Sequence, residues 1–237
     1  MDRPGIRTDE EIAVPRIHFQ LQLAELKDKL LAMASLAELA LGTSVEAYLH
    51  RDEALSRSVA ELEREINAAE RNVDEMAYEL LAKEQPMAID LRFILSVIKI
   101  NGDLERVGDQ SVNISERALL LREYPKVDLP IDIRTMGAHA GKMIRLSIQA
   151  LLEADAKLAE SVLAMDDEID AMNSAVQLSL IQVMQEQPEV ATQALNAIII
   201  SRNLERAADH ATNIAEDVIF WVRGSDVRHT ISLAHAE

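Results

Sequence analysis

The sequence predicts an all-α protein built from two tandem three-helix bundles, and three observations lead to this prediction. Residues that lose little rotamer freedom in a helix dominate, while the 237 residues include only 7 Gly and 6 Pro. Apolar residues recur at alternating spacings of four and three, which is the pattern of bundle helices. The second half of the chain repeats motifs of the first half, which indicates a duplicated unit.

Turn residues divide the chain into six expected helices. Gln85–Pro86 and Gln187–Pro188 mark two similar turns, and residues 124–130 form a linker because each proline disfavours helix at the residue before it. Gly224 is a typical residue just after a helix end. The helices are expected at about residues 10–50, 52–83, 86–122, 131–152, 155–185 and 188–224.

The two halves align along their last helices. The segment that begins at Asn101 matches the segment that begins at Ser201, with Leu, Glu, Arg, Asp, Asn and Ile at corresponding places. Further upstream, the residues around Asp52 match those around Asp155. One helix–helix–helix unit has therefore been duplicated, and the repeats are predicted at residues 8–123 and 131–224.

Composition excludes several classes of protein. The net charge is −17, and such a surface repels nucleic acid and anionic lipid headgroups. There is no Cys, so disulfides and zinc–thiolate sites are excluded. No signal-peptide pattern is present, and the longest uncharged run, 190–201, is shorter than the ~20 residues that a membrane span needs. We expect a soluble, cytoplasmic protein.

Paired carboxylates stand out in the last helix of each repeat. Glu105 and Asp109 are four residues apart, as are Glu205 and Asp209, so each pair shares one helix face, which points away from the core stripe. Like charges at this spacing disfavour a helix by roughly 0.2–0.5 kcal/mol per pair. Their presence in both repeats suggests that something positive lies between them.

Bending the second repeat at its Gln-Pro turn adds partners to this pair. In an antiparallel helix pair, two residues that face each other at the same height have residue numbers whose sum is the same along the whole pair. This rule places Asp166 level with Asp209 and Asp170 level with Glu205. Four carboxylates are then expected to meet in one outer groove.

The same construction in the first repeat gives a weaker set. Glu63 stands level with Asp109, and Asn67 stands level with Glu105, so this set has three carboxylates and one amide. Asn113 and Asn213, one turn beyond the motif aspartates, are candidate peripheral ligands.

These two sets predict surface metal sites. Hard oxygen ligands suit iron, manganese, magnesium or calcium, and zinc is possible. Several carboxylates around an open groove can hold more than one ion. The predicted ligands are Glu63, Asn67, Glu105, Asp109, Asp166, Asp170, Glu205 and Asp209, with Asn113 and Asn213 at the periphery.

Two other interpretations stay open. The acids can be solvated side chains that form local ion pairs with Arg106 and Arg206, in a metal-free helical scaffold that docks a basic partner through its acidic face. An enzyme is disfavoured, because no Glu has a His three residues later, no His is repeated between the halves, and no phosphate-binding loop or nucleophile elbow is present.

Motifs across nearly the whole chain resemble the PhoU family, the accessory proteins of phosphate-specific transport. They are Leu-Glu-Arg-Val-Gly-Asp at 104–109, Leu-Glu-Arg-Ala-Ala-Asp at 204–209, the turn at 85–92 and residues 220–229. The resemblance implies two three-helix bundles with multinuclear iron or zinc clusters on the motif carboxylates. It carries over to Glu105, Asp109, Glu205, Asp209, Asp166 and Asp170, whereas Glu63 and Asn67 match less well.

The resemblance also implies a biological role. Members are negative regulators of phosphate uptake and of phosphate-starvation signalling, and they are not enzymes. They contact the transporter's ATPase subunit and the sensor histidine kinase at the inner face of the membrane, often as homodimers. We therefore expect these partners for this chain, with membrane association only through them and with no nucleic acid.

Overall fold

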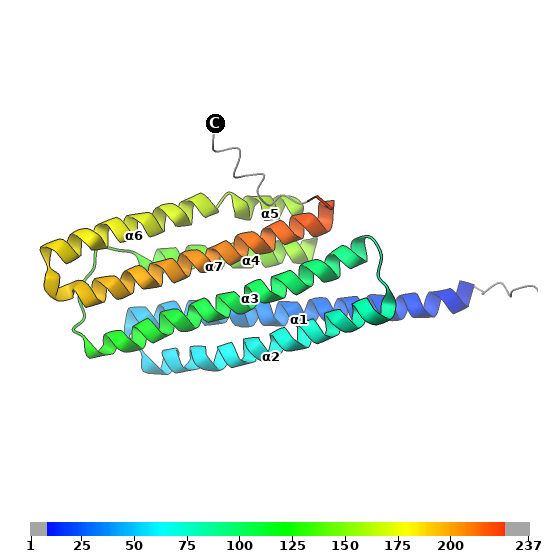
Figure 1. Ribbon diagram of the computed structural model, residues 1–237, viewed down its shortest axis with the longest axis horizontal. Coiled ribbons are helices and arrows are strands. Elements are labelled where there is room, and N and C mark those ends of the chain that lie inside the picture. The colour runs from blue at the N-terminus through cyan, green and yellow to red at the C-terminus, as the bar shows by residue number, and fades with distance from the viewer. Residues whose placement is uncertain (1–8, 226–237) are drawn as a thin grey trace, which may run out of the picture.

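The computed structural model describes residues 9–225, with side chains from Ile17 onward, and this part of the chain is all-helical (Figure 1). A short 3-10 turn, η1 (Leu121–Glu123), follows α3, and a second one, η2 (Pro188–Val190), precedes α7. The predicted start of the first repeat at residue 8 and the last residues of the 220–229 motif lie outside the described range. The helices are α1 (Asp9–His50), α2 (Glu53–Glu84), α3 (Ile89–Leu120), α4 (Ile133–Glu153), α5 (Ala156–Leu163), α6 (Asp166–Glu186) and α7 (Ala191–Arg223).

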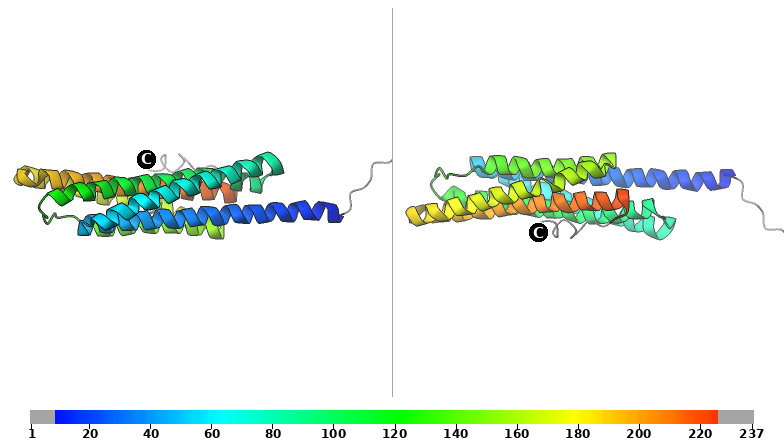
Figure 2. Two further views of the ribbon diagram at one scale, coloured as in Figure 1. Left: turned by 90° about the horizontal axis from the view of Figure 1, so that it is seen from below. Right: turned by 90° about the horizontal axis from the view of Figure 1, so that it is seen from above.

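The helices form two similar bundles that share one core. Helices α1, α2 and α3 pack together, α4 to α7 form the second bundle, and α3 and α7 lie side by side between them (Figures 1 and 2). One hydrophobic cluster continues through both bundles and includes Leu26, Ile100, Ile144 and Ile214. The predicted all-α fold with two helical repeats is confirmed, and the repeats are joined by packing as well as by the linker.

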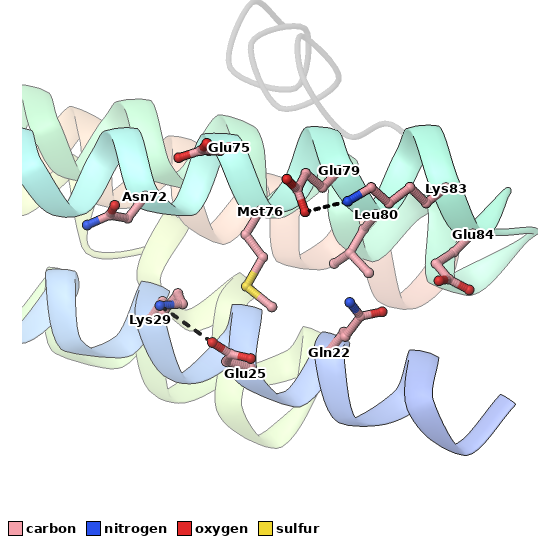
Figure 3. A pocket seen from close by; sticks show the side chains of 10 residues that line it. All are labelled: Gln22, Glu25, Lys29, Asn72, Glu75, Met76, Glu79, Leu80, Lys83 and Glu84. Carbon is pink, nitrogen blue, oxygen red and sulfur yellow. Dashed lines mark hydrogen bonds and ion pairs between the residues drawn. The ribbon is translucent and has the colours of Figure 1, made fainter. Parts of the chain in front are cut away.

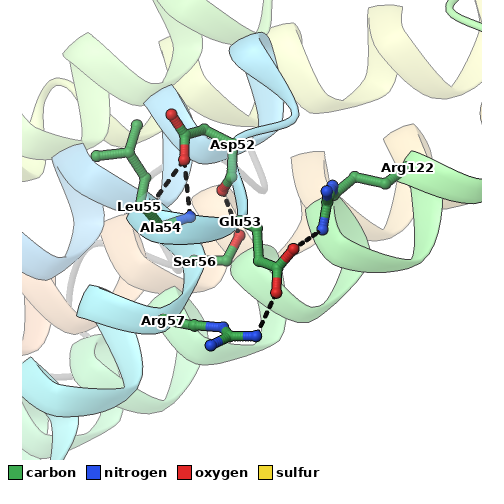
Figure 4. Close-up of polar contacts among 7 residues, drawn as sticks. All are labelled: Asp52, Glu53, Ala54, Leu55, Ser56, Arg57 and Arg122. Carbon is green, nitrogen blue, oxygen red and sulfur yellow. Dashed lines mark hydrogen bonds and ion pairs between the residues drawn. The ribbon is translucent and has the colours of Figure 1, made fainter.

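The duplication extends to individual hydrogen bonds. Asp52 starts α2 by accepting from the backbone N–H groups of Ala54 at 2.7 Å and Leu55 at 3.1 Å (Figure 4). Asp155 starts α5 in the same way, by accepting from the N–H groups two and three residues ahead. A carboxylate at this position satisfies backbone donors that have no partner within the helix.

A salt-bridge network holds the start of α2 against the end of the first repeat. Glu53 accepts from Arg57 on its own helix and from Arg122 in η1 (Figure 4). These pairs lower the pKa of Glu53, chiefly through the hydrogen bond from Arg122. These exposed ion pairs link the start of α2 to the end of the first repeat.

One expected helix is divided. Instead of a continuous helix over 155–185, α5 ends at Leu163, a turn follows, and α6 begins at Asp166. Three consecutive acids, Asp166 to Glu168, occupy the first turn of α6, where the helix dipole favours negative charge. His139 of α4 supports the turn, with its Nε2 atom 3.2 Å from the carbonyl oxygen of Met165. The prediction of one continuous helix over 155–185 is therefore wrong, because the acids at 166–168 favour a new helix start.

Helix α1 has the length and composition of a membrane span. Residues 17–50 pass this test among the described helices, but half of their most apolar window is buried inside the protein. Leu26, Leu30 and Met33 are fully buried there. The apolar character of α1 is therefore that of a core helix in a soluble bundle.

Candidate metal centre

In the second hairpin, four carboxylates lie close enough for the charge of one to affect the ionisation of another. Asp166 and Asp170 lie on α6, and Glu205 and Asp209 lie on α7. The pKa of Asp209 is raised to about 6, first by burial and then by the charges of Glu205, Asp166 and Asp170. His210, the next residue, opposes this shift weakly. The four residues that the turn places at matching heights are therefore close together, since the charges of the other three raise the pKa of Asp209.

Asp166 and Glu205 respond in the same direction. Burial raises the pKa of both, and the charge of Asp170 is the next largest cause for each. Asp166 also has an Oδ1 atom that is buried and has no hydrogen-bond partner in the described structure. A buried carboxylate oxygen without a donor is costly, so this atom is suited to a cation.

Arginine does not neutralise this set directly. No ion pair within 4.0 Å joins Arg206 to Glu205 or to Asp209 in the described part of the chain, although Arg202 and Arg206 together lower the pKa of Glu205. The negative charge of the set is therefore offset only in part and without a close arginine pair.

The first hairpin differs because its acids have local partners. Arg106 lies 3.4 Å from a carboxylate oxygen of Glu105 and 3.3 Å from one of Asp109. Glu63 accepts a hydrogen bond from the amide of Asn67. Burial and the charge of Asp109 still raise the pKa of Glu105, while Arg106 opposes them. This set is partly neutralised without a metal.

Sequence reasoning missed one acid of the first set. The charge of Glu70 raises the pKa of Glu105 slightly more than the charge of Glu63 does. Glu70 follows Asn67 by three residues and Glu63 by seven, so the spacing of one helix face was the available signal. Asn101 holds this part of α2 against α3 by donating to the backbone oxygen of Glu70 at 3.0 Å.

The two candidate peripheral amides lie in different surroundings. Asn113 is exposed on α3. Asn213 donates to Asp103 of α3 at 3.1 Å, and His210 Nδ1 lies 2.8 Å from the same carboxylate oxygen. In this conformation the Asn213 amide joins α7 to α3 and does not turn toward Asp209.

The side chains are neighbours without forming a closed coordination shell. Among residues 17–225, no three His, Asp or Glu side chains are arranged together to hold a metal ion. The charges of the four second-hairpin acids act on one another, but their oxygens do not converge on a point. Metal binding there requires side-chain rotation, which partly exposed carboxylates on rigid helices can make.

In a separate acidic groove between α1 and α2, two of the four lining acids pair with lysines. This groove has a volume of about 330 Å³ and a floor that includes Met76 (Figure 3). Lys29 pairs with Glu25 at 3.6 Å, and Lys83 pairs with Glu79 at 3.0 Å. These two close lysine pairs distinguish the groove from the second hairpin, where no arginine lies within ion-pair distance of Glu205 or Asp209 in the described part of the chain.

Comparison with known proteins identifies the family. A sequence profile described as PhoU domain matches residues 30–118 and again residues 133–218. The chain belongs to the PhoU family. A phosphate-specific transport system accessory protein PhoU homolog from Pseudomonas aeruginosa is 39% identical over 212 residues, which cover 89% of this chain and 88% of that protein. PhoU homolog 1 of Thermotoga maritima is 32% identical over 91% of this chain and 93% of its own length.

Solved PhoU structures have the same fold. The crystal structure of PhoU from Pseudomonas aeruginosa superposes with a TM-score of 0.84 at 38% identity, covering 87% of this chain and all of that one. The phosphate transport system regulatory protein PhoU from Streptococcus pneumoniae gives a TM-score of 0.82 at 27% identity, covering 88% and 99%. PhoU proteins are accessory and regulatory proteins, not enzymes.

Proposed function

We propose that this chain is a non-enzymatic, metal-binding regulator of phosphate-specific transport. Membership of the PhoU family supports the regulatory role, since its relatives are named as accessory and regulatory proteins of that transport system. The metal-binding part rests on one observation: the second hairpin gathers four mutually repelling carboxylates, and among the described residues none of them has an arginine within ion-pair distance.

Asp166, Asp170, Glu205 and Asp209 would hold the cation. Their oxygens suit iron, manganese, magnesium or calcium, and zinc is possible, with more than one ion in the open groove. The unpartnered Oδ1 atom of Asp166 fits this use. A bound cation would supply positive charge and would cross-link α6 to α7. Glu63, Asn67, Glu105 and Asp109 would form a weaker second site, because Arg106 already supplies charge there.

The partners proposed for this regulator are components of the phosphate transporter and its signalling circuit. We place the protein in the cytoplasm, where it would contact the transporter's ATPase subunit and the sensor histidine kinase and act as a negative regulator of phosphate uptake, as a homodimer. The names of the relatives support a phosphate transport system partner.

Metal analysis separates the two hairpins. The chain is purified without chelator and its metal content is measured by mass spectrometry, beside a variant with D166N, D170N, E205Q and D209N. The matched control carries E63Q, E105Q and D109N in the first hairpin. We expect the first variant to lose most of the bound metal and the control to keep most of it. Equal metal in all three proteins would contradict the assignment.

Phosphate uptake tests the regulatory role separately. A strain that lacks the chain should take up phosphate without restraint in phosphate-rich medium, and the wild-type gene should restore restraint. If the variant with D166N, D170N, E205Q and D209N also restores restraint, the chain regulates phosphate uptake without needing the metal. Unchanged uptake in the strain without the chain would contradict the regulatory role.

A metal-free scaffold is the second candidate, and the first hairpin favours it. Arg106 pairs with both motif acids there, and no closed coordination set is present among the described side chains. In this case the acidic face would dock a basic partner directly. Binding of the ATPase subunit that is unaffected by chelator but weakened by salt would support the scaffold.

A further inference from the structure

The helix that carries the first predicted ligands begins differently in the two repeats. Asp166 of the second hairpin corresponds to Glu63 of the first hairpin at an offset of 103 residues. Glu63 lies inside α2, which runs without a break from Glu53 to Glu84. Asp166 is instead the first residue of α6, after a turn that separates α6 from α5. At a helix start the first N–H groups have no partner within the helix, so this predicted ligand depends on other contacts for its position.

A histidine meets this helix start at a place where the first repeat has a leucine. Helices α1 and α4 correspond at the same offset of 103, as Ser44 and Ser147 show, since both are buried and donate to the carbonyl oxygen three residues before them. At this offset His139 corresponds to Leu36, which packs against the hydrophobic core. The imidazole adds hydrogen-bonding atoms that leucine lacks.

His139 is held between the backbone and a side chain at the start of α6. Its side chain is 10% exposed, and its Nε2 atom lies 3.2 Å from the carbonyl oxygen of Met165. Because a carbonyl oxygen can only accept, Nε2 carries the proton and donates. The Nδ1 atom lies 3.7 Å from a carboxylate oxygen of Glu168. The ring therefore connects α4 to the turn that precedes Asp166.

The carbonyl of Met165 has only a long backbone hydrogen bond. It accepts from the N–H of Glu168, three residues ahead, at 3.3 Å. At the start of α5, the carbonyl of Asp155 accepts from Ala159, four residues ahead, at 3.1 Å. Bonds that span three residues have the poorer geometry of the 3-10 helix. His139 therefore supplies a second donor to a carbonyl that the helix itself satisfies weakly.

This hydrogen bond bears directly on the position of Asp166. The carbonyl of Met165 and the N–H of Asp166 belong to one planar peptide unit, so fixing the oxygen also fixes the unit from which Asp166 projects. The Oδ1 atom of Asp166 is buried and has no hydrogen-bond partner in the described structure. No side-chain donor thus orients this oxygen, and the backbone before it has to do so.

We propose that His139 is a positioning residue for the cation site of the second hairpin, which it serves by holding Asp166 in place through the Met165 carbonyl. The inference rests on the proposed binding of metal by this hairpin. His139 would not contact the cation, because its Nε2 atom is engaged by the backbone. The first repeat has Leu36 at this place and an unbroken α2, so the arrangement is particular to the second hairpin.

Manganese affinity tests the role in binding. The E63Q, E105Q and D109N background isolates the second hairpin, and free Mn²⁺ is counted by electron paramagnetic resonance in the full chain. We expect H139L to bind about tenfold more weakly, as is usual when a residue that orients a metal ligand is lost. H139Q keeps an N–H donor and should restore affinity to within about threefold of the background. H50L is the matched control, since His50 is an exposed histidine that pairs with Glu46 on α1.

Hydrogen exchange in the metal-free protein tests the position of the turn without any metal. In H139L the amides of Glu168 and Ile169 should exchange roughly tenfold faster, because the start of α6 opens more often, and H139Q should restore their protection. The midpoint of urea unfolding should change little in H139L, since leucine fits the corresponding place in the first repeat. This pair of measurements separates a local effect from general destabilisation, and circular dichroism checks that each variant is folded.

Three results would overturn the proposal: H139L binds manganese as tightly as the background does, H139Q is as weak as H139L, or exchange at Glu168 and Ile169 is unchanged in H139L. If the background itself binds no manganese, the proposed metal site fails and the role of His139 in it fails too. The exchange result would then still decide whether His139 holds the turn.

Discussion

The two hairpins share a backbone plan and differ in how their acids are neutralised. In the first hairpin Arg106 lies 3.4 Å from Glu105 and 3.3 Å from Asp109. In the second hairpin burial and mutual repulsion raise the pKa of Asp209 to about 6. A repeated sequence motif therefore does not fix its electrostatics, because nearby charges and burial decide whether the acids need a cation.

The largest expected difference is stabilisation by metal. Adding a divalent cation to the metal-free protein should raise stability by about 4 kcal/mol once free metal reaches roughly 1,000 times Kd. For a chain of this size that corresponds to a rise in Tm of roughly 8–16 °C, measured by scanning calorimetry. The variant with D166N, D170N, E205Q and D209N should show little of this rise, whereas E63Q with E105Q and D109N should keep most of it. The opposite ranking would make the first hairpin the principal site.

A smaller difference is expected from pH in the metal-free protein. Asp209 binds its proton more tightly in the folded state, so the stability due to this proton is fully present below its ordinary pKa of 3.8 and is lost as pH rises through about 6. D209N should remove this loss and stabilise the metal-free protein at pH 7 by on the order of 1–3 kcal/mol. Urea unfolding at pH 4 and pH 7 measures it. D109N serves as the first-hairpin control, and an equal gain from D109N would contradict the difference between the hairpins.

Removing the arginine should make the first hairpin resemble the second. R106Q deletes the cation that pairs with both motif acids, so the pKa of Glu105 should rise further and metal affinity at the first site should increase about tenfold. Equilibrium dialysis in the D166N, D170N, E205Q and D209N background isolates this site. R206Q in the E63Q, E105Q and D109N background is the matched control for the second hairpin, where we expect a smaller change. Unchanged affinity in R106Q would mean that the arginine does not weaken the first site.

The smallest expected difference concerns the helix starts. D52A should cost about 1 kcal/mol of global stability, because α2 is continuous from Glu53 to Glu84. D155A should cost less, because the short α5 ends at Leu163 and α6 has its own start. Chemical unfolding measures the total, and hydrogen exchange should show loss of protection confined to α5 in D155A. Loss of protection along α6 as well would show that the turn at 164–165 does not separate the two helices.

Sequence reasoning reached the fold because its signals are local and repeated. The apolar stripes predicted the helices, the Gln-Pro turns predicted which helices pair, and the duplicated segments predicted two repeats. The heights deduced from the turn correctly placed Asp166 near Asp209. The helix break before Asp166 was not predicted, because acids that favour a helix start cannot be distinguished by sequence from acids that bind a cation.

Contacts between the repeats could not be predicted. Asp103 of α3 contacts His210 and Asn213 of α7 only because these two helices pack together. The sequence of either helix by itself does not specify this packing. A small cavity lined by Tyr48, Leu129 and Gln193 likewise depends on how the linker crosses between the repeats. The sequence indicated that Arg106 can pair with the motif acids of the first hairpin. How far it neutralises them depends on side-chain distances, which residue spacing does not determine.

Anomalous X-ray diffraction from crystals grown with manganese tests the central claim most directly. The account predicts an anomalous peak in the groove between α6 and α7, within coordination distance of carboxylate oxygens from Asp166, Asp170, Glu205 and Asp209, and a weaker peak or none at the first hairpin. A groove without anomalous density at saturating manganese, or a peak only at Glu105 and Asp109, would contradict it.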